Sequence, residues 1–459
     1  MAQKINRRDL LKAGAAAGIG MAMTSKGDPT APPQRRGKSV VGLTTPKMER
    51  VRVGFVGVGA RGSGHVAQML SIDGVEVTAI CDVHAPSANT SAKRVVDKGR
   101  PAPTLYTNGP RDYLRLVQDP KVDIVIISTP WQDHVPMAVA AMKAGKHAFI
   151  EVPAAITVDG CWELVDTAEQ TQRHCMMMEN VNYGREELMV LNMCRQGVFG
   201  ELLHGEAAYI HDLRGQMHEI ERGTGSWRTL HYTRRNGNLY PTHGLGPVAQ
   251  YMNINRGDRF DYLSSMSSPS RVREIYAREK FPEGHPRRRL KFVCGDINTT
   301  IIKTALGKTI LVQWDEQLPR PYTRLNLIQG TRGVWAGFPN RIVVEKGTEH
   351  PATSTTEAWT QGQNLAPWYE RYEHPLWKRV ASDPSNQGGH GGMDFVMLWR
   401  IVYCLRNGLP LDQDVYDAAA WSVVGPLSEM SVANRGRSLD VPDFTRGQWK
   451  TMPPLGVVS

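Results

Sequence analysis

Short apolar runs alternate with amphipathic helical patterns along the chain between residues 51 and 178. The runs predict buried strands, and apolar positions that recur every three or four residues predict helices. Buried strands separated by helices form a doubly wound parallel sheet, so we predict an α/β fold. The predicted strands are residues 51–58, 75–81, 122–128, 147–150 and 174–178, and the predicted helices are residues 63–70, 88–96, 113–117, 135–144 and 158–170.

The pattern changes after residue 178. Segments rich in Thr and Val, with polar residues at alternate positions, predict an open, largely antiparallel sheet with one polar face. Such a face can present side chains to a ligand. We therefore predict a C-terminal α+β domain over residues 179–459, which the helices after residue 390 close. Its predicted strands are residues 202–210, 299–305, 309–314, 323–329 and 341–345, and its predicted helices are residues 188–195, 395–405 and 415–433.

The formal charge of +10 on this 459-residue chain is concentrated at the N-terminus. Residues 1–50 hold ten Lys or Arg and three Asp or Glu, a charge of +7, which leaves about +3 for the rest. The run Arg287-Arg288-Arg289 has no interleaved aromatic residues and is interpreted as a solvated loop. Nucleic acid is therefore not an expected partner.

The N-terminus carries a targeting signal. Asn6-Arg7-Arg8-Asp9-Leu10-Leu11-Lys12 precedes a weakly apolar stretch at residues 13–23 that is too short for a stable membrane span. This order indicates a twin-arginine signal, so we expect the twin-arginine export machinery as a partner and the periplasm as the destination. That route carries folded proteins, often with a cofactor. Residues 24–47 are interpreted as a flexible linker, so that residues 1–48 comprise signal and linker.

A glycine-rich turn follows the first predicted strand. Gly57, Gly59 and Gly62 suit a tight turn, close backbone approach to a pyrophosphate and close helix packing. Asp82 follows Gly62 by twenty residues at the end of the second strand. A carboxylate there accepts hydrogen bonds from the adenosine ribose and repels a 2′-phosphate. We therefore predict a Rossmann domain over residues 49–178 with NAD as its cofactor.

The cysteines and histidines do not indicate a metal centre. The six cysteines show neither paired metal spacing nor a compact disulfide pattern. His390 and Asp394 are four residues apart, a spacing that suits metal ligands, but no third ligand stands with them. No metal is predicted.

Two further segments end predicted strands, where ligands bind in parallel sheets. They are Ser128-Thr129-Pro130-Trp131-Gln132-Asp133-His134 and Glu151-Val152-Pro153. This Thr-Pro-x-x-x-His and Glu-x-Pro arrangement resembles the glucose-fructose oxidoreductase and inositol dehydrogenase family, which joins a Rossmann domain to an open-sheet substrate domain. Dehydrogenases of that family have a lysine in the middle of the second motif, where it handles a substrate proton. Val152 cannot do so, which weakens the interpretation as an ordinary dehydrogenase.

Motifs along nearly the whole chain resemble glycoside hydrolase family 109. The resemblance implies an alpha-N-acetylgalactosaminidase that keeps NAD bound through oxidation at C3, elimination, water addition and re-reduction. Most glycosidases use a pair of carboxylates, whereas NAD-dependent glycosidases do not, and no convincing carboxylate pair stands out in this sequence. The motifs are Trp131-Gln132-Asp133-His134, Glu151-Val152-Pro153-Ala154-Ala155, Glu179-Asn180 with Tyr183, Trp227-Arg228, the segment from Tyr240 to Pro247, and His390-Gly391-Gly392-Met393-Asp394-Phe395.

The resemblance also implies site residues. His243, whose ordinary pKa is about 6.5, suits a base for the C3 hydroxyl. Tyr183 is the candidate for the C2 proton, with the division of protons between the two left open. The predicted cofactor contacts are Gly57, Gly59, Arg61, Gly62, Asp82, Trp131, His134, Glu151, Val152 and Asn180, and the predicted sugar contacts are Tyr209, Arg228, Tyr240, Pro241, Thr242, His243 and Tyr322.

Two alternatives share this fold. An exported NAD(P)-dependent sugar oxidoreductase of the glucose-fructose oxidoreductase type would release an oxidised sugar and leave reduced cofactor. A non-catalytic sugar sensor would bind the ligand without turnover. Each would take a small-molecule or glycan ligand, and a homo-oligomer is compatible with all three interpretations.

Overall fold

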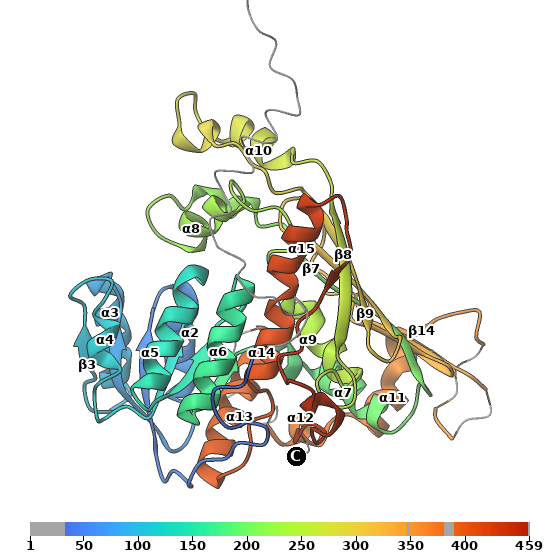
Figure 1. Cartoon of the computed structure of the whole chain (residues 1–459), viewed down its shortest axis with the longest axis horizontal. Helices are drawn as coiled ribbons and strands as arrows, with labels where there is room; N and C mark the ends of the chain where they lie inside the picture. The colour runs from blue at the N-terminus through green and yellow to red at the C-terminus, as the bar shows by residue number, and fades with distance from the viewer. Residues whose placement is uncertain (1–32, 347–348, 352, 354, 381–389, 458–459) are drawn as a thin grey trace, which may run out of the picture.

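The computed structural model describes residues 33–457, except residues 347–348, 352, 354 and 381–389, and contains two sheets (Figure 1). The twin-arginine motif lies outside the described residues and stays a prediction. Within the described ranges, no helix has the length and apolar character needed to cross a membrane.

The first sheet has six strands, and each neighbouring pair is parallel. The strand order β3-β2-β1-β4-β5-β6 is that of a dinucleotide-binding Rossmann domain, so the predicted α/β class is confirmed. Sequence patterns missed only the short strand β3. The strands are β1 (Val51–Val56), β2 (Val75–Cys81), β3 (Thr104–Tyr106), β4 (Ile124–Ile127), β5 (His147–Ile150) and β6 (Cys175–Met177).

Helices connect these strands at the positions that the apolar periodicity predicts. Thr157 caps the last of them, because its hydroxyl accepts a hydrogen bond from the backbone N–H of Gly160. The helices are α2 (Ala60–Met69), α3 (Ala85–Asp97), α4 (Tyr113–Leu116), α5 (His134–Lys143) and α6 (Val158–Thr171).

The second sheet has the order β14-β13-β12-β11-β7-β10-β9-β8-β15. Among its described strands only the β7–β10 pair is parallel, which confirms the largely antiparallel open sheet. The strand predicted from residue 323 begins later, because Leu325 and Asn326 have positive φ angles that a strand does not accommodate. The strands are β7 (Leu202–Ile210), β8 (Phe260–Ser267), β9 (Asn298–Thr304), β10 (Thr309–Asp315), β11 (Leu327–Gly330), β12 (Gly333–Ala336), β13 (Arg341–Val344), β14 (Thr360–Gln361) and β15 (Leu439–Asp440).

Helices α9 and α15 pack against the second sheet, on β7 and β8 respectively. The single helix predicted for residues 415–433 is divided at Val423 into α14 and α15, and Pro426 in the first turn of α15 has no N–H to continue the hydrogen bonds of α14. The helices of this half are α7 (Arg185–Arg195), α8 (Thr224–His231), α9 (Thr242–Tyr251), α10 (Val272–Lys280), α11 (Ala366–Tyr372), α12 (Pro375–Val380), α13 (Met393–Asn407), α14 (Val415–Ser422) and α15 (Val424–Ala433).

The C-terminal helices return to the first half of the chain. Helix α13 packs against α2 and β1, and α14 packs against α6 and β6. Figure 1 shows α14 and α15, in red, between the Rossmann half and the second sheet. The predicted domain boundary at residue 178 therefore lies between the segments that form the two sheets. It does not divide the packing in the same way, because α13 and α14 follow the boundary but pack against elements that precede it.

The predicted flexible linker is wrong for its described part. The guanidinium of Arg35 donates to Gln448 Oε1 at 2.7 Å, and the backbone N–H of Val40 donates to the hydroxyl of Tyr416 at 3.2 Å. Val40 is buried. These contacts fix residues 35–40 against the C-terminal part of the chain, which the local composition alone could not indicate.

The prediction that the Arg287 run is a solvated loop is also wrong at Arg287 itself. This side chain is buried and donates from Nε to the carbonyl of Met217 at 3.1 Å. Its Nη2 donates to the carbonyls of Glu219 at 2.6 Å and Gly225 at 3.1 Å. Arg287 therefore binds the loop before helix α8 from inside.

Close packing of α9 on β7 gives a first prediction. A β-carbon on Gly244 would lie 2.2 Å from the backbone nitrogen of Ala208, so Gly244→Ala forces α9 away from the sheet. We expect a loss of about 1–3 kcal/mol in the free energy of unfolding, measured by urea denaturation. Gly64→Ala, at an exposed position of α2, is the control, because no atom lies within 4 Å of its β-carbon. Equal stability of the two variants would contradict the packing argument.

Two buried histidines give a second prediction. The rings of His147 and His174 lie 5.0 Å apart, and the backbone N–H of His174 donates to Nδ1 of His147. Burial lowers the pKa of His147 to about 3 and that of His174 to about 4. The unfolded chain, with pKa values of about 6.5, binds these protons first. The free energy of unfolding should therefore fall as the pH decreases from 6.5 towards 4.

Urea titrations at pH 7.5 and pH 5 measure this loss. Each histidine contributes a slope of at most about 1.4 kcal/mol per pH unit. A variant carrying His147→Asn and His174→Gln should lose less stability between the two pH values than the wild type does. His204→Asn, at a half-exposed histidine of β7, is the control for replacement of an imidazole.

Candidate active site

The glycine turn between β1 and α2 has the geometry of a dinucleotide cradle. Gly57 has a φ of +83°, and a β-carbon on Gly62 would lie 1.9 Å from the carbonyl oxygen of Gly57. At Gly59 the nearest atom to a β-carbon is Nη2 of Arg222, at 3.8 Å, so this side is open. The open turn leads directly into the N-terminus of α2, and backbone N–H groups at a helix N-terminus stabilise a diphosphate. The residues present therefore fit the predicted dinucleotide.

Asp82 lies beside this turn at the end of β2. Its Oδ2 accepts a hydrogen bond from the backbone N–H of Val58 and its Oδ1 one from that of His84, both at 2.8 Å. Each carboxylate oxygen has a further lone pair for a ribose hydroxyl. A pocket of about 350 Å³ opens here, lined by Val58, Gly59, Ala60, Ser63, His84, Pro86, Ser87, Thr90, Ser91, Arg94 and Arg222.

Arg61 lies between two carboxylates rather than along the turn. Its Nε donates to Glu151 Oε1 at 2.7 Å, and its Nη1 donates to Asp394 Oδ2 at 2.7 Å. Asn180 donates to the other oxygen of Asp394 at 2.6 Å. Burial opposes ionisation of Glu151, but Arg61 and His65 outweigh it and lower the pKa of this carboxyl. Three predicted cofactor contacts, Arg61, Glu151 and Asn180, are thus brought together.

The His390 and Asp394 pair belongs to the same network. His390 Nδ1 lies 2.8 Å from Asp394 Oδ2, which also accepts from Arg61. Burial opposes ionisation of Asp394, but hydrogen bonding to His390 and the charge of Arg61 lower its pKa. Among the residues that the structure describes, no group of three or more His, Cys, Asp or Glu side chains could hold a metal ion.

His134 joins two loops at this edge of the sheet. Its Nδ1 lies 2.8 Å from the carbonyl oxygen of Pro153, and its Nε2 lies 2.8 Å from that of Thr129. The side chain is fully buried, and this burial lowers its pKa. The neutral ring therefore donates to one of these two carbonyls and lies against the other, which places it between the two loops, and its contact with the cofactor stays a prediction. Val152, in the second loop, is buried.

His243 is held by a buried carboxylate. It lies in the first turn of α9, and its Nδ1 is 2.6 Å from Oε1 of Glu179, which follows β6. Glu179 is fully buried. Because the carboxylate accepts a hydrogen bond from Nδ1–H, Nε2 is the nitrogen with a lone pair, and it lies 3.3 Å from the hydroxyl of Tyr240. The pair therefore orients His243 as a base.

Aromatic rings surround His243. The ring of Tyr209 lies 5.2 Å from His243 and 4.8 Å from Tyr240, and Tyr322 lies 6.1 Å from Tyr209. His211 lies 5.2 Å from Tyr322. The structure thus brings together Tyr209, Tyr240, His243 and Tyr322 as predicted, with Pro241 and Thr242 buried at the start of α9.

Arg228 closes one side of this aromatic group. Its guanidinium carbon lies 4.9 Å from the ring centre of Trp131 and 5.0 Å from that of Tyr240. Its Nη1 donates at 3.2 Å to Glu316, which is fully buried. Trp131 comes from the loop after β4 and Arg228 from helix α8. The predicted cofactor contact Trp131 therefore meets the predicted sugar contact Arg228.

Tyr183 is not part of this group, which corrects the prediction that it handles the C2 proton. Its hydroxyl donates to Asp412 at 3.2 Å within the core that includes α13. Burial raises its pKa well above the ordinary value. The sequence motif placed Tyr183 near Asn180 along the chain, but the short helix of residues Asn180–Tyr183 turns the two side chains to different partners.

Sequence reasoning missed three polar residues of the site. Glu179 orients His243, Glu316 pairs with Arg228, and the Nδ1 of His211 lies 3.3 Å from the hydroxyl of Tyr209. Glu179 had a usable signal, because it follows a buried strand at the carboxyl edge of the sheet. Glu316 and His211 depend on the register of the second sheet, which no local pattern specifies.

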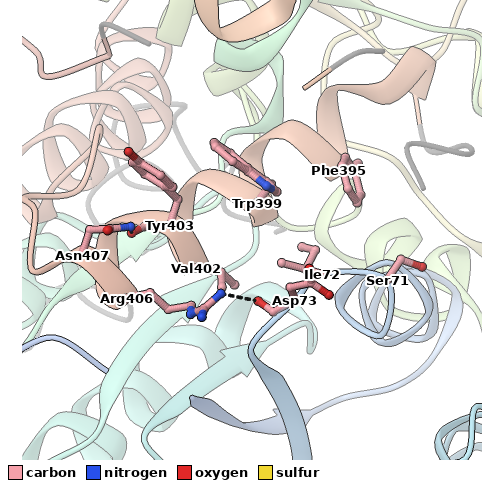
Figure 2. Close-up of a pocket in the computed structure, with 9 residues that line it drawn as sticks. All are labelled: Ser71, Ile72, Asp73, Phe395, Trp399, Val402, Tyr403, Arg406 and Asn407. Atoms are coloured by element: carbon pink, nitrogen blue, oxygen red, sulfur yellow. Dashed lines mark hydrogen bonds between the residues drawn. The ribbon is translucent and has the colours of Figure 1, made fainter. Parts of the chain in front are cut away.

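A second pocket, of about 370 Å³, lies elsewhere (Figure 2). Figure 2 shows Trp399 and Tyr403 on α13, with Arg406 donating to the carbonyl of Asp73 at 3.2 Å. Asp73 precedes β2, so this pocket lies at the amino edge of the parallel sheet, whereas ligands bind at its carboxyl edge. We assign it no part in the reaction.

Comparisons with known proteins agree with this geometry. Residues 183–451 match the family description "Glycosyl hydrolase 109, C-terminal domain". The chain belongs to glycosyl hydrolase family 109. Residues 51–179 match "Oxidoreductase family, NAD-binding Rossmann fold". A "Glycosyl hydrolase family 109 protein 1" from Shewanella sp. (strain MR-4) is 59% identical over 459 residues, 99% of each chain, and a family 109 protein from Shewanella putrefaciens has the same identity and coverage.

Solved structures of this architecture are more distant. An NAD-binding oxidoreductase from Klebsiella pneumoniae has a TM-score of 0.65 at 16% identity, covering 86% of this chain and 99% of its own. A levoglucosan dehydrogenase in complex with NADH and L-sorbose has a TM-score of 0.63 at 18% identity, covering 86% and 100%. These likenesses show the fold. The family 109 chain is thus an enzyme with an NAD-binding Rossmann domain, and NAD is its cofactor.

The contact between Glu179 and His243 gives a third prediction. Glu179→Gln replaces the carboxylate by an amide of the same shape, which no longer fixes the Nδ1 proton of His243. We expect kcat for glycoside hydrolysis to fall about 100-fold, with KM and bound NAD unchanged. Glu206→Gln, at a half-exposed glutamate of β7, is the matched control. A normal kcat, or a fall accompanied by loss of NAD, would contradict the positioning role.

Proposed function

We propose that this family 109 enzyme is an alpha-N-acetylgalactosaminidase that retains NAD and works by oxidation at C3, elimination, water addition and re-reduction. One observation carries the proposal. His243 is oriented by Glu179 inside the group of aromatic rings, while buried Val152 stands where a related dehydrogenase would have its lysine. The site therefore contains a candidate base, His243, but lacks the lysine that related dehydrogenases have at the position of Val152.

The cofactor, when bound, supplies a hydride acceptor and donor for C3 of the sugar. His243 takes the proton of the C3 hydroxyl on Nε2, because Nδ1 is occupied by Glu179. The imidazolium that forms is stabilised by that buried carboxylate. The same nitrogen returns the proton when the C3 ketone is reduced again, so the residue ends each cycle as it began.

The C2 proton needs a second base, and the structure favours the pair of Tyr209 and His211. Burial raises the pKa of Tyr209, so its phenol starts protonated and cannot act alone. Its hydroxyl lies 3.3 Å from Nδ1 of His211, and burial lowers the pKa of His211 and keeps it neutral. The C2 proton passes to the oxygen of Tyr209 while its phenolic proton passes to His211. The C1–O bond breaks, and the departing oxygen takes a proton from solvent. Water addition reverses these transfers: hydroxide from solvent adds to C1, C2 takes a proton from the hydroxyl of Tyr209, and His211 returns its proton to the phenolic oxygen.

The remaining residues bind the sugar. Aromatic faces cover the C–H patches of a sugar, and Arg and Tyr groups bind its hydroxyl and amide oxygens. Tyr240, Tyr322 and Arg228 supply both kinds of contact around His243. The buried pair of Arg228 and Glu316 holds the guanidinium against the ring of Tyr240.

We also propose that the enzyme is exported by the twin-arginine route and acts in the periplasm. The motif Arg7-Arg8 and the apolar stretch after it support this proposal. Export in the folded state suits an enzyme that has to keep its cofactor, because the compartment outside the inner membrane does not have to resupply NAD.

Hydrolysis in heavy water gives a fourth prediction. The purified enzyme, without added cofactor, should cleave a nitrophenyl alpha-N-acetylgalactosaminide and place deuterium at C2 of the released sugar, measured by NMR. No net NADH should accumulate, because the hydride returns to C3. The corresponding 3-deoxy glycoside should be inert. In a panel of nitrophenyl glycosides, other sugars should react more slowly.

Variants and alternative outcomes complete this experiment. His243→Ala and His211→Asn should each abolish turnover while NAD stays bound. Protium alone at C2, or ready cleavage of the 3-deoxy glycoside, would overturn the mechanism. A released ketosugar with mole-for-mole reduction of NAD would instead identify a sugar oxidoreductase, and binding without turnover a sensor.

A further inference from the structure

Arg222 belongs to the second half of the chain but lies at the glycine turn of the first. Its Nη2 is 2.7 Å from the hydroxyl of Ser87 and 3.6 Å from Oδ2 of Asp82. The same atom is the nearest neighbour of a β-carbon built on Gly59, at 3.8 Å. Of the described residues that line the pocket beside Asp82, Arg222 alone comes from beyond β6. A cation from the substrate half therefore faces the diphosphate cradle.

The loop that carries Arg222 is held from inside the protein. Arg287 donates to the carbonyls of Met217, Glu219 and Gly225, on both sides of Arg222. The carboxylate of Glu219 accepts a hydrogen bond from the backbone N–H of Gly225 at 2.6 Å. Figure 1 shows helix α8, which follows this loop, on the side of the Rossmann helices. These contacts hold the loop in place, and its Arg222 side chain reaches Ser87 and Asp82 of the Rossmann half.

The partners of Arg222 are weak compared with a diphosphate. Ser87 offers a neutral hydroxyl, and Asp82 already accepts two backbone hydrogen bonds. A diphosphate carries full negative charges and acceptor oxygens, and guanidinium pairs with such groups by strong, charge-assisted hydrogen bonds. The Rossmann side contributes Arg94 to the same pocket, but Arg94 is committed to the carbonyl of Ser63 at 3.0 Å.

The geometry points to Arg222 as a cofactor-retaining residue that pairs with the diphosphate of NAD and holds the dinucleotide between the two halves of the enzyme. This inference rests on the proposed catalytic cycle, in which NAD stays bound. The inference adds that a residue of the substrate half, Arg222, slows the release of NAD. NAD leaves only after Arg222 has broken its contact with the diphosphate, so the residue acts on the dissociation rate.

The fifth prediction concerns retention of NAD by purified variants. Arg222→Ala should lose NAD on gel filtration, measured in the denatured supernatant, and its dissociation rate for NAD should rise about 10- to 100-fold. Arg222→Lys should recover part of the retention, because it restores the charge. Arg214→Ala is the matched control, since Arg214 pairs with Asp212 away from the turn.

Ser87→Ala separates cofactor binding from simple docking of the loop. It removes the hydroxyl that Arg222 contacts but keeps the guanidinium, so NAD should be retained at least as well as in the wild type. Loss of NAD from Ser87→Ala equal to that from Arg222→Ala would overturn the inference, because both would then act by releasing the loop. Full retention by Arg222→Ala would overturn it as well.

Two further outcomes distinguish this inference from others. If Arg222→Ala weakens binding of NADP but not of NAD, the residue contacts a 2′-phosphate and the assignment to the diphosphate is wrong. If the wild type itself contains no NAD and binds none, the proposed catalytic cycle fails. If the wild type retains NAD and Arg222→Ala retains it equally well, only the role of Arg222 is rejected.

Discussion

A buried ion network holds the cofactor half of this enzyme together. Arg61 at the start of α2 lies between Glu151 after β5 and Asp394 at the start of α13. Removal of one partner from such a network leaves an uncompensated buried charge, which costs far more than the intact pair contributes. The carboxyl edge of the parallel sheet, the glycine turn and the C-terminal helix therefore keep their relative positions as one unit.

Close packing positions the candidate catalytic and sugar-binding residues of the second half at the carboxyl edge of the parallel sheet. Gly244 lets α9 approach the backbone of β7, and His243, the preceding residue, then meets Glu179 after β6. Tyr209 comes from β7 itself and Arg228 from α8. The base thus depends on both halves of the chain: its carboxylate partner Glu179 follows β6 of the first sheet, and the surrounding rings come from β7 and from segments outside the named strands of the second half.

The fold was largely predictable from the sequence because it depends on apolar periodicity. The strands from Val75 to Cys81, His147 to Ile150 and Leu202 to Ile210 have the predicted bounds. Motifs also brought together His243, Tyr209 and Arg228. The predictions that failed depend on contacts between distant segments: Tyr183 contacts Asp412, and the N-terminal segment packs on Tyr416. Residue type and spacing carry no information about such partners.

The return of α13 to the first sheet has a consequence for the order of folding. Arg61 and Asp394 are 333 residues apart in sequence, and α13 shares an apolar core with α2 through Val396 and Val66. Contacts of such long range form late, because the intervening chain has to be closed into a loop first. During synthesis the N-terminal sheet therefore stays incompletely covered until α13 has been made and released from the ribosome. Stable loading of the dinucleotide is in this sense a post-translational event.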